Sequence, residues 1–416
     1  MKILSITAQK PSSTGSGVYL TELVKSFWNI GEEQAVVAGI YQEDQVELPS
    51  GVRFFPVYFE SKKLPWPIAG MSDEMPYRST RYCDMTEEMA EAFRKSFLEV
   101  ITQAVEELDP DLILCHHLYL LTAFVREQFP EQRIYGFCHN TDIRQMEKTD
   151  LRRDYIAGQI RALDRIFVPQ KAQRDKVIEI YQADPGKIQE VGVGYNHHIF
   201  CPNRREAEDG VTRIVYAGKI AKKKGVMSLL SALSHLKLPA ESLSLFLAGG
   251  AGNEEEYQEI REAAKACPYP VEFLGRLPQK KLAEVYNFCD VFVLPSFFDG
   301  LPLTVIEALA CRDRVVMTDL PGIREWLETH APGGDVRYVE PPRMRDTDEP
   351  LEEDLPDFEE RLAEALKESI EKKKSGGSEK AAADVSGISW EAIGRSVLDS
   401  AEADKAKDLT KKGQGC

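Results

Sequence analysis

The sequence predicts an α/β fold made of two doubly wound, Rossmann-like domains. Short apolar runs rich in β-branched residues alternate with longer segments of helical periodicity, and this series lapses once and then restarts. A chain of 416 residues also exceeds what one hydrophobic core usually supports. We therefore expect one domain over residues 1–198, a second over 199–388, a helix over 389–405 and a frayed tail over 406–416.

In the first half, five apolar runs are expected to be strands covered on both faces. They are KILSIT, QAVVAGI, DLILCHH, RIYGFCH and RIFVPQ. Three segments between them carry apolar residues at three- and four-residue steps, as amphipathic helices do: TELVKSFWNI, TEEMAEAFRKSFLEVITQAVEEL and KAQRDKVIEIY. Residues 66–85 interrupt this order as a long irregular insertion, and long loops in compact domains often bind ligands.

The periodicity lapses over VGVGYNHHIFCPNRREAEDG, where glycine, asparagine, proline and charge accumulate. A second series of strands is expected after it: RIVYAGKI, LSLFLAGG, VEFLGRL, VFVLPS and RVVMTD. Residues 373–386 are expected to be a linker. In doubly wound sheets ligands bind beyond the carboxyl ends of the strands, so we expect the active cleft there, between the two domains.

Composition and charge limit the classes of function. A formal net charge of -16 disfavours nucleic acid as a partner. The eight cysteines form no C-x-x-C pair and no dense framework, which disfavours metal sites and disulfides and indicates a reducing compartment. Neither a signal peptide nor a transmembrane segment is evident, so we expect a cytoplasmic protein, with attachment at the inner membrane face left open.

A lysine-rich loop, AGKIAKKKG, joins an expected strand to an expected helix in this acidic protein. Glycine lets the backbone approach a ligand closely, a helix N-terminus favours negative charge, and lysine supplies countercharge to phosphate. The pattern therefore predicts an anion site, with a solvated basic loop as the alternative. It does not have the G-x-x-x-x-G-K-[ST] spacing of a nucleotide triphosphatase.

The stretch PSFFDGLPLTVIEALA places two carboxylates around a helix start, with Pro302 expected at the first helical position. Asp299 is expected in the turn and Glu307 in the second helical turn. Both could accept hydrogen bonds from sugar hydroxyls, while N–H groups around Gly300, Leu301 and Leu303 could hold phosphate oxygens. A capped helix with a solvated aspartate is the alternative.

These stretches resemble the family 4 glycosyltransferases of the GT-B fold, which are retaining enzymes that use nucleotide-diphosphate sugars. The family's glutamate, seven residues and glutamate appear here as Asp299 and Glu307, and its Gly-Arg and Lys-Gly pairs as Gly218-Lys219 and Lys224-Gly225. VEFLGRLPQKKLAEVYNFCDVFVLPS, VGVGYNHHIF, CHNTDIRQ and STGSG resemble further family segments in order. The GT-B fold also implies a C-terminal helix that returns to the first domain.

The resemblance implies a role for each matching residue. Lys219 and Lys224 would stabilise the leaving diphosphate. Asp299, Gly300 and Leu301 would hold the sugar, and Glu307 the ribose. The other implied donor contacts are His139, Gly15, Gly17, Gly218, Gly275, Arg276, Leu277 and Leu303. Asp299 is one methylene shorter than the family's glutamate, and Lys219 lacks the bidentate fork of arginine.

The predicted activity is transfer of a hexosyl group from a nucleotide-diphosphate sugar, with UDP favoured, to an acceptor hydroxyl on a glycan, lipid or small molecule. No cofactor and no metal are expected. Arg78, Tyr82 and His116 are the acceptor-site candidates, and the lack of a basic amphipathic patch in the first domain favours a soluble acceptor. A nucleotide-sugar epimerase and a catalytically weak sugar-nucleotide-binding relative remain as alternatives. The sequence does not indicate the oligomeric state.

Overall fold

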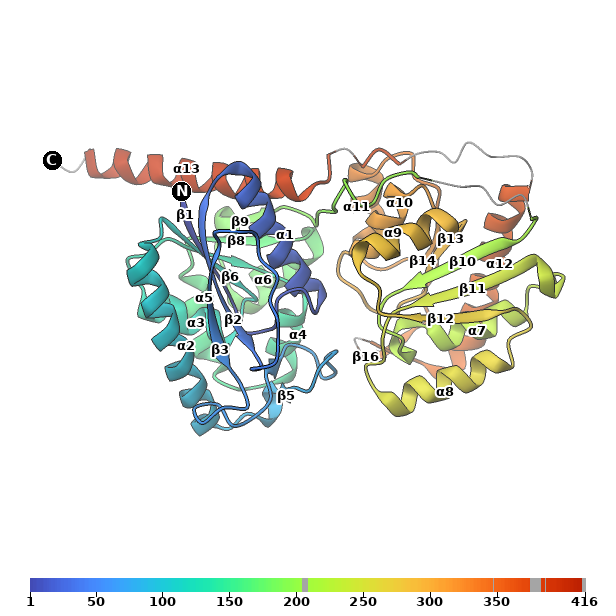
Figure 1. Cartoon of the computed structure of the whole chain (residues 1–416), viewed down its shortest axis with the longest axis horizontal. Coiled ribbons are helices and arrows are strands. Elements are labelled where there is room, and N and C mark those ends of the chain that lie inside the picture. The colour runs from blue at the N-terminus through green and yellow to red at the C-terminus, as the bar shows by residue number, and fades with distance from the viewer. Residues whose placement is uncertain (204–208, 347, 375–382, 386, 414–416) are drawn as a thin grey trace. The chain divides into compact units, whose positions relative to one another are not determined.

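The computed structural model describes residues 1–203, 209–346, 348–374, 383–385 and 387–413. It divides into two compact units (Figure 1). Unit 1 comprises residues 1–194 and 390–416, and unit 2 comprises residues 195–389. The chain therefore passes from unit 1 to unit 2 at Gly194, four residues before the predicted boundary, and returns at Trp390.

Unit 1 contains a seven-stranded parallel sheet with the strand order β3-β2-β1-β6-β7-β8-β9. Its strands are β1 (Lys2–Thr7), β2 (Glu33–Ile40), β3 (Arg53–Tyr58), β6 (Leu112–His116), β7 (Ile134–Phe137), β8 (Arg165–Val168) and β9 (Ile188–Glu190). Its helices are α1 (Gly15–Ile30), α2 (Glu87–Leu108), α3 (Leu120–Gln128), α4 (Thr141–Lys148), α5 (Arg153–Arg161), α6 (Lys171–Tyr181) and α13 (Trp390–Gly413). A small parallel pair, β4 (Ala69–Gly70) and β5 (Thr80–Arg81), lies in the predicted insertion.

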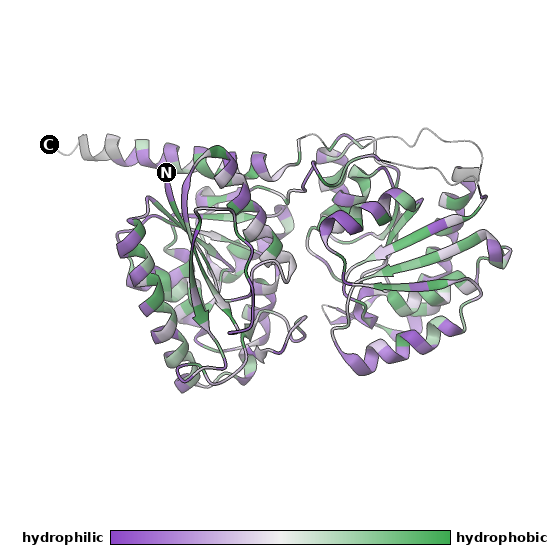
Figure 2. Ribbon diagram, viewed as in Figure 1, coloured by the Kyte–Doolittle hydropathy of each residue, from purple (hydrophilic) through white to green (hydrophobic). Residues whose placement is uncertain are grey.

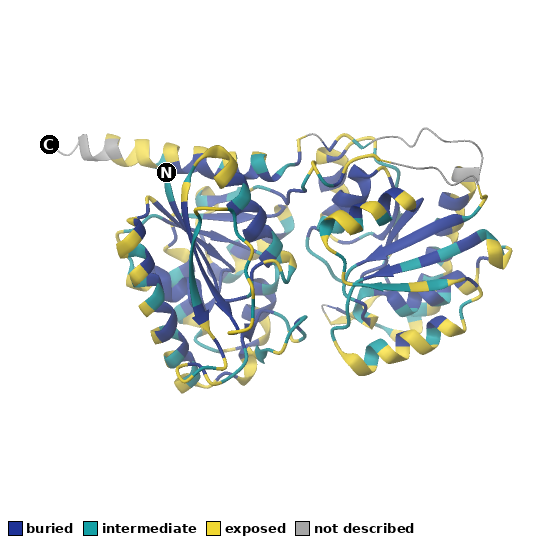
Figure 3. Cartoon of the chain, viewed as in Figure 1, coloured by how far each residue is buried: buried dark blue, intermediate teal, exposed yellow. Residues whose placement is uncertain are grey.

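Both faces of the unit 1 sheet are covered. Alternate residues of β2 point to opposite faces: Ala35 and Val37 belong to the large core that includes α2, whereas Val36 and Ala38 pack with residues of α1. This two-sided burial explains why the central strands read as continuous apolar runs. Figure 2 shows hydrophobic residues along the strands, and Figure 3 shows the same strands buried and the outer helix faces exposed.

Unit 2 repeats this architecture with a six-stranded parallel sheet in the order β12-β11-β10-β13-β14-β15. Its strands are β10 (Thr212–Ala217), β11 (Leu243–Ala248), β12 (Val271–Gly275), β13 (Val291–Leu294), β14 (Arg314–Thr318), β15 (Val336–Val339) and the antiparallel pair β16 (Met344–Asp346) and β17 (Glu349–Pro350). Its helices are α7 (Val226–Ser234), α8 (Glu254–Lys265), α9 (Gln279–Phe288), α10 (Leu303–Ala310), α11 (Ile323–His330) and α12 (Leu355–Lys374).

The predicted fold class is confirmed, including the C-terminal helix that joins the first domain: α13 packs against α1, and Asp404 accepts a hydrogen bond from the Tyr135 hydroxyl at 2.7 Å. Two details differ from the prediction. The helix continues to Gly413, so the tail expected from residue 406 is mostly helical. Pro302 is the N-cap of α10 and Leu303 its first residue.

Two further observations concern segments singled out in the sequence. The predicted linker at 373–386 lies largely outside the described residues, and α12 extends to Lys374. Among the described residues, no helix combines the length and apolar character needed to span a membrane.

Candidate functional site

The strand order of each main sheet reverses at one point, and the predicted site residues in the loops after the adjoining strands lie there. Gly275 instead ends the edge strand β12, and Arg276 and Leu277 follow it. In unit 2 this point lies between β10 and β13, where Ile214 pairs with Val291. The lysine-rich loop, residues 217–225, follows β10, and the Asp299 turn follows β13. Neighbouring parallel strands whose connections run in opposite directions leave a crevice beyond their carboxyl ends, which is where ligands bind in such sheets.

The backbone of the lysine-rich loop is held in one conformation by close contacts. Gly225 has φ +69°, and a Cβ atom built on it would lie 2.0 Å from the Pro295 carbonyl oxygen. Only glycine allows both that conformation and that approach. At the other end of the loop, the buried Tyr216 hydroxyl donates to the Lys219 carbonyl oxygen at 2.6 Å. The loop is therefore fixed against the segment that carries Asp299.

Lys224 and Asp299 meet, although they are 75 positions apart. Lys224 Nζ lies 2.8 Å from Asp299 Oδ2 and donates to the Phe298 carbonyl oxygen at 3.1 Å. Each side chain is 23% exposed, so the pair remains within reach of solvent and of a ligand. The structure thus joins the two motifs that the sequence singled out for phosphate and sugar.

The other lysines of the loop lie apart from this pair. Lys222 forms an ion pair with Glu259 of α8, and Lys223 Nζ lies 4.0 Å from Asp348 Oδ2. The Lys219 side chain lies over Gly252, since a Cβ atom built on Gly252 would be 2.9 Å from Lys219 Nζ. Lys219 and Lys224 are the two members of the loop that the family resemblance selected.

A glycine-rich turn after β11, which sequence reasoning did not assign to the site, lies beside the lysine-rich loop. Gly218 N–H donates to the Ala248 carbonyl at 2.9 Å, and Gly249 N–H donates to the Gly275 carbonyl at 2.8 Å. The Arg276 side chain lies over Gly250, because a Cβ atom built on Gly250 would be 2.5 Å from Arg276 Nε. The signal that would have found this turn is LAGGAG directly after a strand.

The start of α10 lacks a capping side chain, because Pro302 is the N-cap and makes no such hydrogen bond. Ser296, also unassigned from sequence, is fully buried between β13 and this helix start, and its hydroxyl has no protein partner. Glu307 is 7% exposed and raises the pKa of the buried Tyr286, in addition to the larger effect of burial. The predicted roles of Gly300, Leu301, Leu303 and Glu307 toward a ligand stay predictions.

In unit 1 the corresponding reversal lies between β1 and β6. The N-terminus of α1 follows β1, and the Thr14 hydroxyl caps it by accepting from Gly17 N–H at 3.1 Å. A Cβ atom on Gly17 would lie 2.7 Å from the Lys10 carbonyl oxygen, whereas one on Gly15 would meet nothing within 4 Å. Gly17 is therefore required by packing, and Gly15 is not.

Three histidines gather at the carboxyl ends of β6 and β7. His116 Nδ1 lies 3.1 Å from His139 Nε2, and His117 Nε2 lies 3.1 Å from the Ser16 hydroxyl of α1. His116 and His117 are buried, while His139 is half-buried. The Tyr19 ring stands edge-on to His139 at 5.2 Å between centroids. Ser16, Tyr19 and His117 were not predicted as site residues, because their proximity depends on the strand order.

Burial keeps these imidazoles uncharged. Desolvation lowers the pKa of His116 and His117 well below 6.5, with a smaller effect from the neighbouring histidines, and it lowers the pKa of His139 to about 3. His116 and His117 are therefore neutral, and they are hydrogen-bonded to His139 and to the Ser16 hydroxyl, respectively. Neutral imidazoles can donate or accept hydrogen bonds, but they supply no countercharge for phosphate.

A buried carboxylate holds the two turns that carry these histidines. Asp142 accepts from the backbone N–H groups of Leu118 at 2.8 Å, Ile143 at 3.1 Å and His139 at 3.2 Å. Desolvation raises its pKa despite these hydrogen bonds. Asp142 thus links the segment after β6 to the start of α4.

The acceptor candidates lie in different surroundings. Arg78 is exposed, pairs with Glu60 at 2.8 Å and lies over the Tyr41 ring at 5.8 Å. Tyr82 is 1% exposed and packs edge-on against Tyr119, so its side chain belongs to the core. A direct contact between Tyr82 and an acceptor would require this segment to open. His116 is buried in the histidine cluster.

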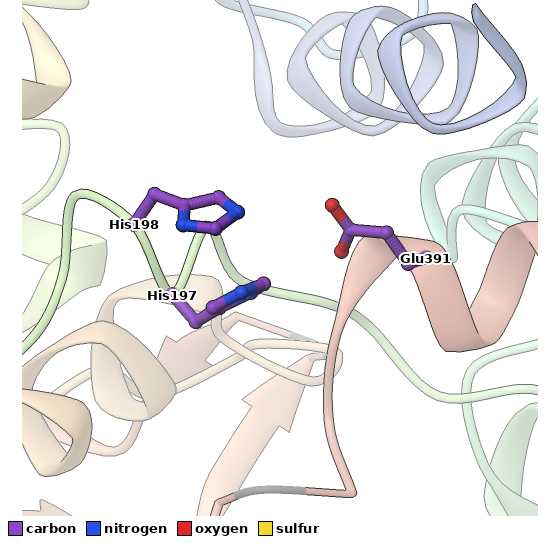
Figure 4. A group of neighbouring side chains, drawn as sticks. All are labelled: His197, His198 and Glu391. Carbon is purple, nitrogen blue, oxygen red and sulfur yellow. The ribbon is translucent and has the colours of Figure 1, made fainter. Parts of the chain in front are cut away.

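Among the described residues, one group of neighbouring side chains could ligate a metal ion, and its members come from both units. His197 and His198 lie side by side with ring centroids 3.9 Å apart and are both exposed, and Glu391 is in the first turn of α13 (Figure 4). The two histidines belong to unit 2 and Glu391 to unit 1, so this group makes no metal site within either unit.

Comparisons with known proteins agree with this geometry. Residues 202–351 match the family described as glycosyl transferases group 1. An alpha-maltose-1-phosphate synthase from Mycolicibacterium smegmatis is 27% identical over 50% of this chain and 54% of its own length. The chain spans about half the length of the curated relatives it matches, or less.

Solved structures share the fold over almost the whole chain. A sucrose-phosphate synthase from Thermosynechococcus elongatus superposes with a TM-score of 0.68 at 17% identity, covering 98% of this chain and 100% of that one. The Anabaena protein HepE in complex with UDP and glucose gives 0.61 at 14% identity, covering 99% and 100%. These likenesses establish a shared GT-B fold.

Proposed function

Because the chain carries a glycosyl transferases group 1 domain over residues 202–351 and has the GT-B fold, we propose that it is a retaining glycosyltransferase. It moves a hexosyl group from a nucleotide-diphosphate sugar to an acceptor hydroxyl. The observation that carries the proposal is the contact between Lys224 and Asp299 at the strand reversal of unit 2. UDP is the proposed nucleotide, supported by the UDP complex of a protein with the same fold.

In this proposal the cations of unit 2 hold the diphosphate. Lys219 and Lys224 neutralise the charge that develops on it as the bond to the sugar breaks, and the uncapped N-terminus of α10 offers N–H groups to its oxygens. Phosphate must draw Lys224 away from Asp299 or share it. Asp299, which then loses part of its ion pair, accepts hydrogen bonds from the sugar hydroxyls.

The reaction needs no separate base. The bond from the anomeric carbon to the phosphate oxygen breaks, the acceptor oxygen bonds to the same face of that carbon, and the acceptor proton passes to the leaving phosphate. Lysines and helix ends serve the charge role that a divalent cation has in other phosphate sites, so we propose metal-independent transfer in the cytoplasm. The cytoplasmic location rests on the unpaired cysteine pattern of the sequence.

A thermal-shift screen of nucleoside diphosphates and their sugars tests the binding claim. A cognate donor at 100 times its Kd stabilises the fold by about 2.7 kcal/mol and raises the melting temperature. If none of these compounds shifts the protein, the proposed function fails. Once a donor is found, NMR of the product with a panel of acceptors shows whether the anomeric configuration is retained, and transfer that survives EDTA supports metal independence.

Two alternatives from the sequence give different outcomes in the same assays. An epimerase would convert the donor without any acceptor, which NMR of the donor alone detects. A sugar-nucleotide-binding relative without activity would give the thermal shift but neither transfer nor slow hydrolysis of the donor. The ordered pairing of Lys224 with Asp299 favours the transferase over both.

A further inference from the structure

The histidine cluster of unit 1 contains one contact that the proposed function does not use. His116 and His139 share a hydrogen bond between His116 Nδ1 and His139 Nε2, at 3.1 Å. Their rings are nearly parallel, with an interplanar angle of 13° and centroids 5.3 Å apart. The His116 ring also lies nearly parallel to that of Phe137, at 9° with centroids 5.0 Å apart, and this second contact restricts its plane.

The surroundings of the remaining two nitrogens differ. His116 Nε2 is buried and has no hydrogen-bond partner. His139 is half-buried, and no described residue forms a hydrogen bond with its Nδ1. A neutral imidazole carries one proton, so the shared hydrogen bond has two possible directions.

Burial decides between these directions. If His139 donated through Nε2, the proton of His116 would sit on Nε2 as a buried N–H without an acceptor. If His116 donates through Nδ1, its buried Nε2 is only an unused acceptor. Orphaned buried N–H groups are rarer in native proteins than under-satisfied buried acceptors. The second direction is therefore favoured.

We propose that His116 is a positioning residue that holds His139 in the Nδ1–H tautomer, so that His139 meets its ligand as a neutral hydrogen-bond donor. His139 Nε2 accepts from His116, and the proton of His139 then lies on the nitrogen without a protein partner. The edge-on contact with Tyr19 at 5.2 Å limits rotation of the ring.

This assignment sets the chemistry of the atom that His139 recognises. A neutral N–H donor selects an oxygen acceptor, such as a sugar hydroxyl or a phosphate oxygen, and discriminates against a ligand that lacks that oxygen. The low pKa of His139 fits this role, because the ring cannot protonate the ligand near neutral pH. The inference about the ligand rests on the proposed function, whereas the inference about the tautomer does not.

Tautomers can be read directly in the full-length protein without any substrate. Long-range ¹H–¹⁵N NMR of protein labelled with ¹⁵N-histidine distinguishes protonated from unprotonated ring nitrogens, and a His139→Gln variant assigns the signals. The expected wild-type result is a protonated Nδ1 and an unprotonated Nε2 in both His116 and His139. A protonated Nε2 in His139 would overturn the proposal even if every variant below failed to fold.

Two variants separate the hydrogen bond from the packing of the ring. His116→Phe keeps an aromatic ring against Phe137 but removes the donor, and His139 should then change to the Nε2–H form or to a mixture. His116→Asn loses the ring but places an amide N–H near the position of Nδ1, and it should restore the Nδ1–H form. An unchanged His139 tautomer in His116→Phe would contradict the proposal.

Kinetics provide the second measurement. His116→Phe should lower kcat/KM for the donor about tenfold, as expected for loss of one well-placed hydrogen bond, and His116→Asn should recover most of it. His330→Phe in α11 is the control, and it should leave kcat/KM unchanged. A donor analogue that lacks the oxygen contacted by His139 should bind the wild type more weakly than the donor does. The His116→Phe variant should discriminate much less between the donor and this analogue.

The two proposals fail in different ways. If the expected tautomers are found but no nucleotide sugar binds, the proposed function is wrong and the role of His116 toward His139 stands. If a donor is bound and transferred but His139 carries its proton on Nε2, the function stands and the role of His116 is wrong.

Discussion

The two units carry similar sheets, but they place opposite kinds of chemistry at the point where the strand order reverses. In unit 2 the loops after β10 and β13 present ionic groups, with Lys224 against Asp299 at 2.8 Å. In unit 1 the loops after β1, β6 and β7 present the Ser16 hydroxyl and neutral imidazoles. The shared topology therefore creates a ligand-binding position twice, and the side chains determine what each position recognises.

Under the proposed function, unit 2 supplies the countercharge and the uncapped N–H groups that a diphosphate needs, together with Asp299 as an acceptor for sugar hydroxyls. The hydrogen-bonding groups of unit 1 are neutral and directional, which suits uncharged oxygen atoms. The buried carboxyl group of unit 1, Asp142, accepts hydrogen bonds from backbone N–H groups and supplies no countercharge for phosphate.

The largest expected effect is a loss of stability of unit 1 in weak acid. The pKa values of His116, His117 and His139 are depressed in the folded state, so the stability that depends on their neutral form is present above about pH 6.5 and is lost as the pH falls. Well below pH 6.5, three such groups cost at most about 4 kcal/mol for each further pH unit. Asp142, whose pKa is raised, acts in the opposite direction but is a single group.

Urea unfolding between pH 5.5 and 7.5 measures this dependence, and hydrogen–deuterium exchange assigns the transition to unit 1. His116→Phe should reduce the slope by roughly one third, since it removes one of the three protonation sites. His330→Phe in unit 2 is the control and should leave the slope unchanged, because His330 is exposed and lies outside the histidine cluster. If both variants kept the wild-type slope, unit 1 would not owe its acid sensitivity to the cluster.

The next effect tests how rigidly unit 2 holds its cations. Gly225→Ala should destabilise the protein by about 3 kcal/mol, from the left-handed backbone at φ +69° and the clash with the Pro295 carbonyl. Gly275 has a similar φ of +68°, but a Cβ atom built on it would meet nothing within 4 Å. Gly275→Ala therefore measures the cost of the left-handed backbone without a clash, and it should destabilise the protein by about 1 kcal/mol. Gly15→Ala in unit 1 meets open space and should be nearly neutral. Urea unfolding of the three variants checks the order, and equal costs would mean that the loop is not fixed against β13.

The third effect concerns the charge of unit 2. Lys224→Ala should lower kcat about a hundredfold, the lower end of what the loss of one charge-stabilising donor costs, and should abolish the thermal shift by a nucleoside diphosphate. Steady-state kinetics and thermal-shift titration measure the two quantities.

Lys222→Ala is the matched control within the same loop. It removes the same charge from a side chain that pairs with Glu259, and it should change neither quantity by more than about twofold. Equal losses from both variants would indicate that the loop acts through its total charge, and a full thermal shift in Lys224→Ala would remove Lys224 from the phosphate site.

The extent to which the sequence predicted the fold follows from burial. The ten predicted strands are all present. Nine of them are mostly buried apolar runs, whereas β12, at an edge of the unit 2 sheet, is half-exposed. The strands that were missed in the two main sheets, β3, β9 and β15, lie at sheet edges. Edge strands are short or half-exposed and tolerate proline, such as Pro56 in β3, so they lack the continuous apolar signal.

The candidate site was predictable where a single stretch carries its own signal. Four lysines in an acidic chain and an aspartate at a helix start are visible locally, whereas the contact between Lys224 and Asp299 requires β10 and β13 to be neighbours. The histidine cluster depends in the same way on the adjacency of β1, β6 and β7. Tyr82 shows the reverse error, since an aromatic residue in an irregular segment suggested a contact with a ligand but packs in the core.

The smallest expected effect concerns an exposed charge of unit 1. Arg78 lies over Tyr41 and pairs with Glu60, next to the region proposed for the acceptor. Arg78→Ala should raise the KM for the acceptor about fivefold, the loss expected from one partly exposed charged contact, and should leave the KM for the donor unchanged. Initial-rate kinetics with each substrate varied in turn separate the two constants.

Arg345→Ala removes a similarly exposed arginine, paired with Glu349 in unit 2, and should alter neither constant. An unchanged acceptor KM in Arg78→Ala would leave the neutral character of unit 1 intact and would place the acceptor away from the insertion, because a charge in contact with the acceptor cannot be removed without weakening its binding.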